Sequence, residues 1–177
     1  DIDAVVVRDG HCENDPELNR LIHRESDRRK VFLLKKGLFG EIDTFGTGSP
    51  LVIVNIPPIP AWDGTLDGRC TLLVPFQDPA NVGAVIRSAA GFGVGKVVML
   101  KGAASPYHPR SVRSSGGAVF KVMINAGPSI EELGGMAERG LPVVALDRQG
   151  VPIESFTRPP QFALLPGIEG PGLPAAM

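Results

Sequence analysis

The chain has 177 residues, with 18 lysines and arginines against 19 aspartates and glutamates, so its formal net charge is −1. Its 43% hydrophobic and 21% charged residues are typical of a globular protein, and no apolar run reaches the roughly 18 residues that a membrane span needs. The two cysteines, Cys12 and Cys70, lie far apart with no histidine pair nearby. This argues against a disulfide scaffold and a metal site, and it favours a cytoplasmic protein.

The first 64 residues are predicted to form a small domain. Residues 17–32 are polar and compatible with a helix that carries a narrow apolar stripe. Residues 51–56 are a nearly continuous β-branched run, which predicts a buried strand. Three prolines then stop regular pairing, and residues 61–69 are expected to form a linker to the next domain.

Basic residues gather in two stretches although the total charge is close to zero. Between Arg20 and Lys36 seven basic residues stand against two acidic ones, and between Lys96 and Lys121 five basic residues occur with no acid. Clusters of this kind can neutralise the phosphates of a nucleic acid. For the first stretch, the solvated face of an ordinary helix is the alternative.

From residue 70 onward, predicted strands alternate with predicted helices. Strands are expected at 70–76, 96–100, 119–124, 141–146 and 162–165, and helices at 80–91, 109–116 and 129–139. This order predicts an α/β fold in which helices cover both faces of a parallel sheet. Ligands of such sheets bind in the loops that follow the carboxyl ends of the strands, so these loops are the candidate sites.

The first of these loops, Asp78-Pro-Ala-Asn-Val-Gly-Ala-Val-Ile-Arg87, joins a strand to a helix. Asp78 or Asn81 can cap the helix, and Gly83 allows another backbone or a ligand to approach closely. Arg87 is the only charged residue between Pro79 and Gly95. A guanidinium on so apolar a helix needs a partner or a cleft, which leaves two hypotheses, a salt bridge or a contact with a bound anion.

Two more loops carry candidate chemistry. Residues 105–118 place Arg110 and Arg113 on one helix face among serines and glycines, which suits phosphate or sugar contacts, with a capped surface helix as the alternative. Residues 164–173 form a glycine-rich loop with one carboxylate, Glu169, and are either a ligand loop or a frayed terminus. The glycines at 91–95 follow a helix and precede a strand, so they are interpreted as a turn rather than a dinucleotide-binding loop.

Taken together, the three loops resemble the signature of the SpoU-type (TrmH-like) RNA 2′-O-ribose methyltransferases of the SPOUT superfamily. That family has a D-P-x-N-x-G-x-x-x-R segment, a P-x-x-x-R-x-S-x-G-A segment and a G-N-E-G-x-G-L loop. Here they stand at residues 78–87, 109–118 and 167–173, in the same order. The resemblance therefore covers most of the chain after residue 70.

The resemblance implies an α/β domain with a C-terminal trefoil knot, S-adenosylmethionine as cofactor, and a homodimer. It implies methyl transfer to a ribose 2′-hydroxyl of structured RNA, either rRNA or tRNA. The family pattern makes Arg87 and Asn81 catalytic and lets Glu169 shape the site. The cofactor would be held around Ala145, Leu146, Leu165, Gly167, Ile168, Gly170 and Leu173. RNA contacts would fall to Arg110, Arg113, Ser114, Arg24 and Arg28.

The domain organisation follows from the same resemblance. Residues 70–177 would be the catalytic domain, and residues 1–64 loosely resemble the end of the small RNA-binding domain of rRNA-modifying members. The appended domain favours rRNA over tRNA as substrate. Two departures stand out, since Ile168 replaces the family asparagine and family members continue past the position of Met177 with a long helix. The expectation is therefore a partial first domain and a missing C-terminal end.

Two other functions compete with the methyltransferase. One is an RNA-binding protein that has the same knotted fold but no catalysis, which Ile168 favours and the intact Asn81 and Arg87 disfavour. The other is a nucleotide-binding protein of flavodoxin type. That protein would need a phosphate-cradling loop after the first strand of the second domain, where Asp78 and Pro79 supply a carboxylate and a residue without an N–H.

Overall fold

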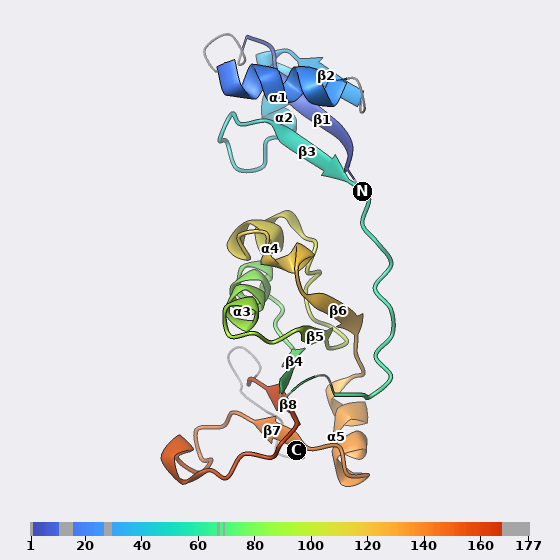
Figure 1. Ribbon diagram of the computed structural model, residues 1–177, viewed down its shortest axis with the longest axis vertical. Coiled ribbons are helices and arrows are strands. Elements are labelled where there is room, and N and C mark those ends of the chain that lie inside the picture. The colour runs from blue at the N-terminus through green and yellow to red at the C-terminus, as the bar shows by residue number, and fades with distance from the viewer. Residues whose placement is uncertain (1, 11–15, 27–29, 67, 69, 168–177) are drawn as a thin grey trace. The chain divides into compact units, whose positions relative to one another are not determined.

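The computed structural model describes residues 2–10, 16–26, 30–66, 68 and 70–167 (Figure 1). The chain divides into two compact units, Asp1–Pro57 and Pro58–Met177. No helix among the described residues combines the length and the apolar character needed to cross a membrane.

The first unit is built on a three-stranded sheet with the strand order β2-β1-β3. Its elements in chain order are β1 (Ile2–Arg8), α1 (Pro16–Ser26), β2 (Lys30–Leu34), α2 (Lys36–Ile42) and β3 (Leu51–Val54). The central strand β1 pairs parallel with β2 and antiparallel with β3. Val7 of β1 and Phe39 of α2 are buried, and α2 packs against β1 to form the small core.

Four elements of this unit differ from the sequence prediction. The strand expected to be buried at residues 51–56 forms as β3, but Val52, Ile53 and Val54 are exposed, because β3 lies at the edge of the sheet. The helix expected at residues 17–32 ends at Ser26, because residues 31–34 pair with β1 instead of continuing the helix. No strand was expected at residues 2–8, although three consecutive valines favour one. No helix was expected at residues 36–42, where two glycines lower helix propensity, and burial of Phe39 offsets that cost.

The second unit has a five-stranded, fully parallel sheet with the strand order β6-β5-β4-β8-β7. Its strands are β4 (Cys70–Val74), β5 (Lys96–Met99), β6 (Met123–Ala126), β7 (Val143–Ala145) and β8 (Phe162–Leu165). Its helices are α3 (Pro79–Gly91), α4 (Pro109–Ser114) and α5 (Ile130–Glu138), with short 3-10 helices η2 (Ala118–Phe120) and η3 (Ile153–Ser155). The predicted α/β fold with a parallel sheet is confirmed. The expected knot involves the segment after Gly167, outside the described residues, and stays a prediction.

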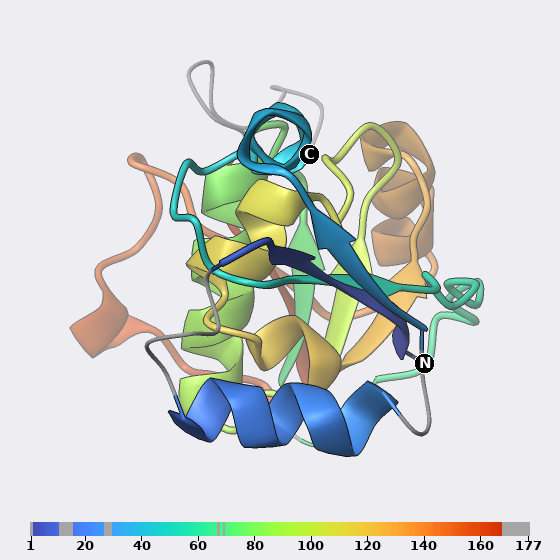
Figure 2. The same cartoon turned by 90° about the horizontal axis from the view of Figure 1, so that it is seen from above.

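Helices cover both faces of this sheet. Successive residues of its strands point to opposite faces, and the side chains on each face are buried under a helix. Leu72 and Val74 of β4 join a core with α3, whereas Leu73 joins a core with Leu133 of α5. Figure 2 shows α3 and α4, in green and yellow, on one side of the strands and α5, in orange, on the other. The strand ends between these layers are the positions at which a ligand can approach.

The strand predicted at residues 119–124 begins later than expected. Residues 118–120 form η2, which follows Gly117 in the left-handed region at φ 79°, and β6 starts at Met123. Val119 is buried, but it belongs to the core shared with α3. It is therefore buried in the core between α3 and the sheet without being part of a strand.

The segment expected as a linker begins on the edge of the second sheet. The amide of Trp62 donates to the carbonyl of Ala126 at 2.8 Å, and the amide of Ala126 donates to the carbonyl of Pro60 at 2.8 Å. Ala61 thereby pairs in parallel with Ala126. We call residues 60–62 the edge clasp. It pairs with the last residue of β6 on the open side of that strand, and the Trp62 side chain packs against the core under α5.

The turn that follows the edge clasp is held by Asp63. Its carboxylate accepts hydrogen bonds from the Thr65 hydroxyl at 2.6 Å and from the Thr65 amide at 2.9 Å. These bonds, assisted by the charge of Lys96, lower the pKa of Asp63 because they stabilise its ionised form. A carboxylate with a lowered pKa adds stability above its unfolded-state pKa, and this contribution is lost as the pH falls through its folded-state pKa.

Thr65→Val is therefore expected to raise the pKa of Asp63, because the hydroxyl bond is the larger cause of its depression. The measurement is an NMR titration of the Asp63 carboxyl carbon in both proteins. The variant should also lose less stability than the wild type when the pH falls into the acid range, in thermal melts. An Asp63 pKa unchanged by the substitution would contradict the assignment.

Candidate functional site

The loops at the carboxyl ends of the strands are tied together by backbone hydrogen bonds. The amide of Ala104, after β5, donates to the carbonyl of Phe76, after β4, at 2.9 Å. On the other side of the sheet, the amide of Leu146, after β7, donates to the carbonyl of Leu165, at the end of β8, at 2.9 Å. Since β4 and β8 pair directly, these loops leave neighbouring strands along one edge of the sheet. We call this edge, where the strands end, the carboxyl edge.

Helix α3 starts at this edge and is capped by the residue that the sequence suggested. The Asp78 carboxylate accepts a hydrogen bond from the Ala80 amide at 2.9 Å, and Pro79 occupies the first turn. Of the two predicted caps, Asp78 is the one that acts at this position. The cap fixes where α3 begins relative to β4, and hence how the later residues of the helix are placed.

Gly83 lies where α3 crosses α4. A Cβ atom at Gly83 would collide with the Ser111 carbonyl oxygen and the Ser114 hydroxyl, and would lie 2.9 Å from the Ser111 carbonyl carbon. Of the two expected reasons for this glycine, the structure therefore shows the approach of another backbone. The two helices are in contact only because this side chain is absent.

Asn81 and Arg87 are both exposed on α3. Six residues of an α-helix correspond to about 9 Å along the axis and about 120° around it, so the two side chains are not on one stripe. The Arg87 side chain makes no hydrogen bond or ion pair with any residue that the structure describes, and the predicted salt bridge is therefore not found there. Helical side chains lean toward the helix N-terminus, which for Arg87 is the direction of the carboxyl edge.

Helix α4 presents the two predicted arginines and turns one predicted serine inward. Arg110 and Arg113 are exposed. His108 caps the helix, its Nδ1 accepting a hydrogen bond from the Arg110 amide at 3.2 Å. The Ser114 hydroxyl donates back to the Arg110 carbonyl at 2.9 Å and abuts Gly83. Its hydroxyl is thus committed to helix packing, a role that sequence spacing does not reveal.

The residues expected around a cofactor come together where β7 and β8 end. Ala145 pairs with Leu165 in register, and Leu146 follows with 55% of its surface exposed. Leu165 is fully buried in the core and Gly167 is half-buried. Ile168, Glu169, Gly170, Leu173 and Arg28 lie outside the described residues. Arg24 is exposed on α1 of the first unit.

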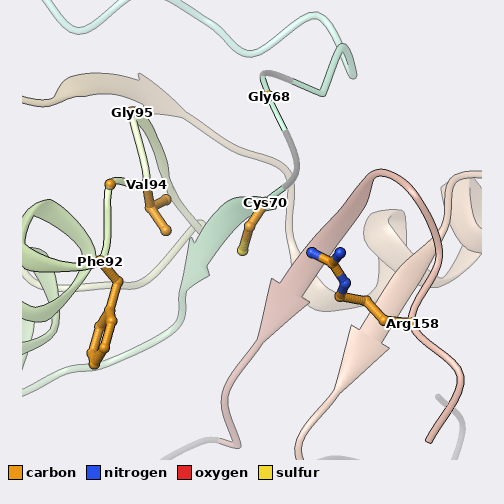
Figure 3. A pocket seen from close by; sticks show the side chains of 7 residues that line it. Gly68, Cys70, Phe92, Val94, Gly95 and Arg158 are labelled. Carbon is orange, nitrogen blue, oxygen red and sulfur yellow. The ribbon is translucent and has the colours of Figure 1, made fainter.

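A cavity of about 450 Å³ lies at the opposite, amino ends of the strands (Figure 3). Cys70, Phe92 and Arg158 line it together with glycines, and the Arg158 side chain extends toward Cys70. Burial raises the pKa of the Cys70 thiol, while the charge of Arg158 lowers it. None of the predicted site residues lines this cavity, and apart from Cys70, which begins β4, its lining residues lie in turns and loops. Among the described residues, no three histidines, cysteines or carboxylates are grouped to hold a metal ion.

The chain matches a known protein family and known rRNA methyltransferases. A model of the SpoU rRNA Methylase family matches residues 69–177. The chain is 44% identical over 145 residues to the ribosomal RNA small subunit methyltransferase G 2 of Syntrophobacter fumaroxidans, covering 81% of this chain and 28% of that protein. It is 27% identical over 152 residues to the 23S rRNA (guanosine(2553)-2′-O)-methyltransferase RlmP of Bacillus subtilis, covering 84% of this chain and 59% of that protein.

A solved structure shares the fold. The AdoMet-bound rRNA methyltransferase from Sinorhizobium meliloti superposes with a TM-score of 0.73 at 21% sequence identity, over 98% of this chain and 66% of that chain. The chain therefore spans only part of the relatives that it matches.

Proposed function

Because the chain belongs to the SpoU rRNA methylase family, we propose that it is an S-adenosylmethionine-dependent methyltransferase acting on a ribose 2′-hydroxyl of rRNA. The observation that carries this proposal is the carboxyl edge itself. The helix with Asn81 and Arg87 leaves β4, and β4 pairs with β8, whose end lies beside Leu146. The Bacillus subtilis relative is named as a 2′-O-methyltransferase of 23S rRNA, and the Sinorhizobium meliloti structure contains the cofactor.

The described part of the edge fits S-adenosylmethionine. Leu146 is apolar yet 55% exposed, and it follows directly on a strand whose neighbour ends at the same level. Such a surface suits the adenine or the methionine chain, and the backbone groups around Leu165 and Gly167 can hydrogen-bond polar atoms of the ligand. When bound, the cofactor supplies a methyl group on a positively charged sulfur.

Arg87 would act on the ribose and not as a base. A ribose hydroxyl is a weak nucleophile, so it must be positioned and helped to lose its proton. A guanidinium stays charged in proteins, which makes it unsuited to accept that proton. The exposed Arg87 can instead bind the neighbouring phosphate and stabilise the negative charge that develops on the ribose oxygen. Asn81 would orient the ribose from the start of the same helix.

The remaining features are proposed on family membership. They are the trefoil knot, the homodimer, and the RNA-binding role of the first unit through its basic residues. The exposed Arg24 supports that role. The exposed Arg110 and Arg113 support an RNA contact by α4.

The test of the cofactor site is calorimetric titration of S-adenosylmethionine into the purified protein. The wild type should bind it, and Leu146→Ala should bind about tenfold more weakly, because the apolar contact is lost without disturbing the core. Ile153→Ala is the matched control, since Ile153 is 83% exposed in the following segment. No binding by the wild type would refute the proposed function, and an unaltered affinity of Leu146→Ala would place the cofactor elsewhere.

A further inference from the structure

An aromatic pair lies outside the residues used so far. The rings of Tyr107 and Phe120 are stacked, with their centroids 6.3 Å apart and their planes 26° from parallel. Tyr107 is half-buried against the core shared by α3 and the sheet. Phe120, in contrast, is 58% exposed. The pair therefore consists of an anchored ring that supports a second ring open to solvent.

Phe120 is held in place by consecutive backbone hydrogen bonds. Its amide donates to the Gly117 carbonyl at 3.1 Å, and the amide of Lys121 donates to the Ala118 carbonyl at 2.9 Å. Ala118 and Val119, the other two residues of η2, are buried. The backbone that carries the exposed ring is held by this turn, and the ring itself is supported by its stacking on Tyr107, so that a ligand meets a preorganised surface.

The charged residues of the segment that carries the pair, and of α3, are all basic. Lys121 follows Phe120 directly. The turn between α4, which carries Arg110 and Arg113, and η2 is closed by a hydrogen bond from the Gly116 amide to the Arg113 carbonyl at 3.1 Å. No acidic residue occurs between Lys96 and Lys121. Helix α3, which also packs against η2, contributes only Arg87. The Lys121 and Arg110 side chains form no hydrogen bond or ion pair within the part of the chain that the structure describes.

We propose that Phe120, supported by Tyr107, is a stacking platform for an unpaired nucleobase of RNA. Lys121 and the arginines of α4 would hold the phosphates on either side of that base. An aromatic face and a cationic track are the two elements that proteins combine to bind single-stranded nucleic acid. The proposal rests on the function proposed above and deepens it, because it makes an unpaired nucleotide a feature of the RNA substrate.

The test uses a short single-stranded oligoadenylate that contains one 2-aminopurine, whose fluorescence is quenched on stacking. The wild type should bind and quench it. Phe120→Leu keeps the apolar bulk but loses the ring, so the affinity should fall about tenfold, and Phe120→Trp should retain it. Phe92→Leu is the matched control, because Phe92 is 88% exposed on the turn between α3 and β5 and should not affect binding. Wild-type affinity in Phe120→Leu, or an equal loss in Phe92→Leu, would overturn the proposal.

Two further measurements separate this proposal from its premise. All variants should bind S-adenosylmethionine like the wild type. Normal cofactor binding with no oligoadenylate binding by the wild type would overturn the platform and leave the methyltransferase. Binding that depends on Phe120, without cofactor binding, would support the platform and refute the methyltransferase. Conversion of a dimer to a monomer by Phe120→Leu would show that Phe120 packs on a second copy, and would also overturn the platform.

Discussion

Arg87→Lys is expected to lower the rate of methyl transfer by about a hundredfold or more, while S-adenosylmethionine binds as before. Loss of one preorganised donor to a developing oxyanion costs about that much in other enzymes. Lysine keeps the charge but not the planar fork, which can hold a phosphate and the ribose oxygen together. Arg87 is exposed and makes no hydrogen bond or ion pair within the described residues, so its replacement should leave the fold intact.

The measurement is transfer of a labelled methyl group to unmodified rRNA, with the 2′-O-methylated product identified after digestion. Arg139→Lys is the matched control, because Arg139 is an exposed arginine that ends α5 on the other face of the sheet. A nearly full rate in Arg87→Lys would contradict the role given to the guanidinium. An equal loss of rate in Arg139→Lys would show that the rate depends on exposed arginines in general and not on the position of Arg87.

Gly83→Ala should destabilise the second unit by about 2 kcal/mol or more, since overpacking of a close contact costs about 1–3 kcal/mol and here the obstacle is backbone. Within a helix the same substitution ordinarily stabilises by up to about 1 kcal/mol. The sign is reversed because the new methyl group would meet the Ser111 carbonyl, which cannot move without shifting α4. Arg110 and Arg113 would shift with that helix.

Chemical denaturation of both proteins measures this difference. Gly91→Ala provides the control on the same helix, because a Cβ atom at Gly91 meets nothing within 4 Å. It should be neutral or slightly stabilising. Removal of the Ser114 hydroxyl in Gly83→Ala/Ser114→Ala should recover only part of the loss, since the Ser111 carbonyl remains. A stable Gly83→Ala protein would mean that the two helices are not in close contact.

The second unit was largely predictable from its sequence, for identifiable reasons. The β4–α3–β5 segment has a continuous apolar strand, an Asp-Pro start signal and a glycine turn, and each of these is a local property. The limits of β6 were not predictable, because Val119 is equally apolar whether it faces a sheet or a helix. In the first unit, the helix predicted at residues 17–32 includes the first three residues of β2, because their strand character depends on pairing with β1, more than 20 residues earlier.

In the candidate site, too, local features were predictable from the sequence and contacts between elements were not. Asp78 could be predicted as a cap because capping depends on neighbours in the chain. The inward turn of Ser114 depends on where α4 crosses α3, and no local pattern encodes that crossing. The stacking of Phe120 on Tyr107 likewise joins residues from different turns. Contacts between elements are what a single sequence leaves open.

The edge clasp decides where the protein can be divided into fragments. Its hydrogen bonds use the amide and the carbonyl of Ala126, and its Trp62 covers part of the core under α5. A fragment that began at Cys70 would free the amide and the carbonyl of Ala126 at the end of β6 to pair with another molecule, which is the usual route from an open strand edge to aggregation. A fragment that begins at Pro58 retains its own cover. We therefore expect the second unit to stay soluble on its own only when the fragment includes the proline-rich segment that begins at Pro58.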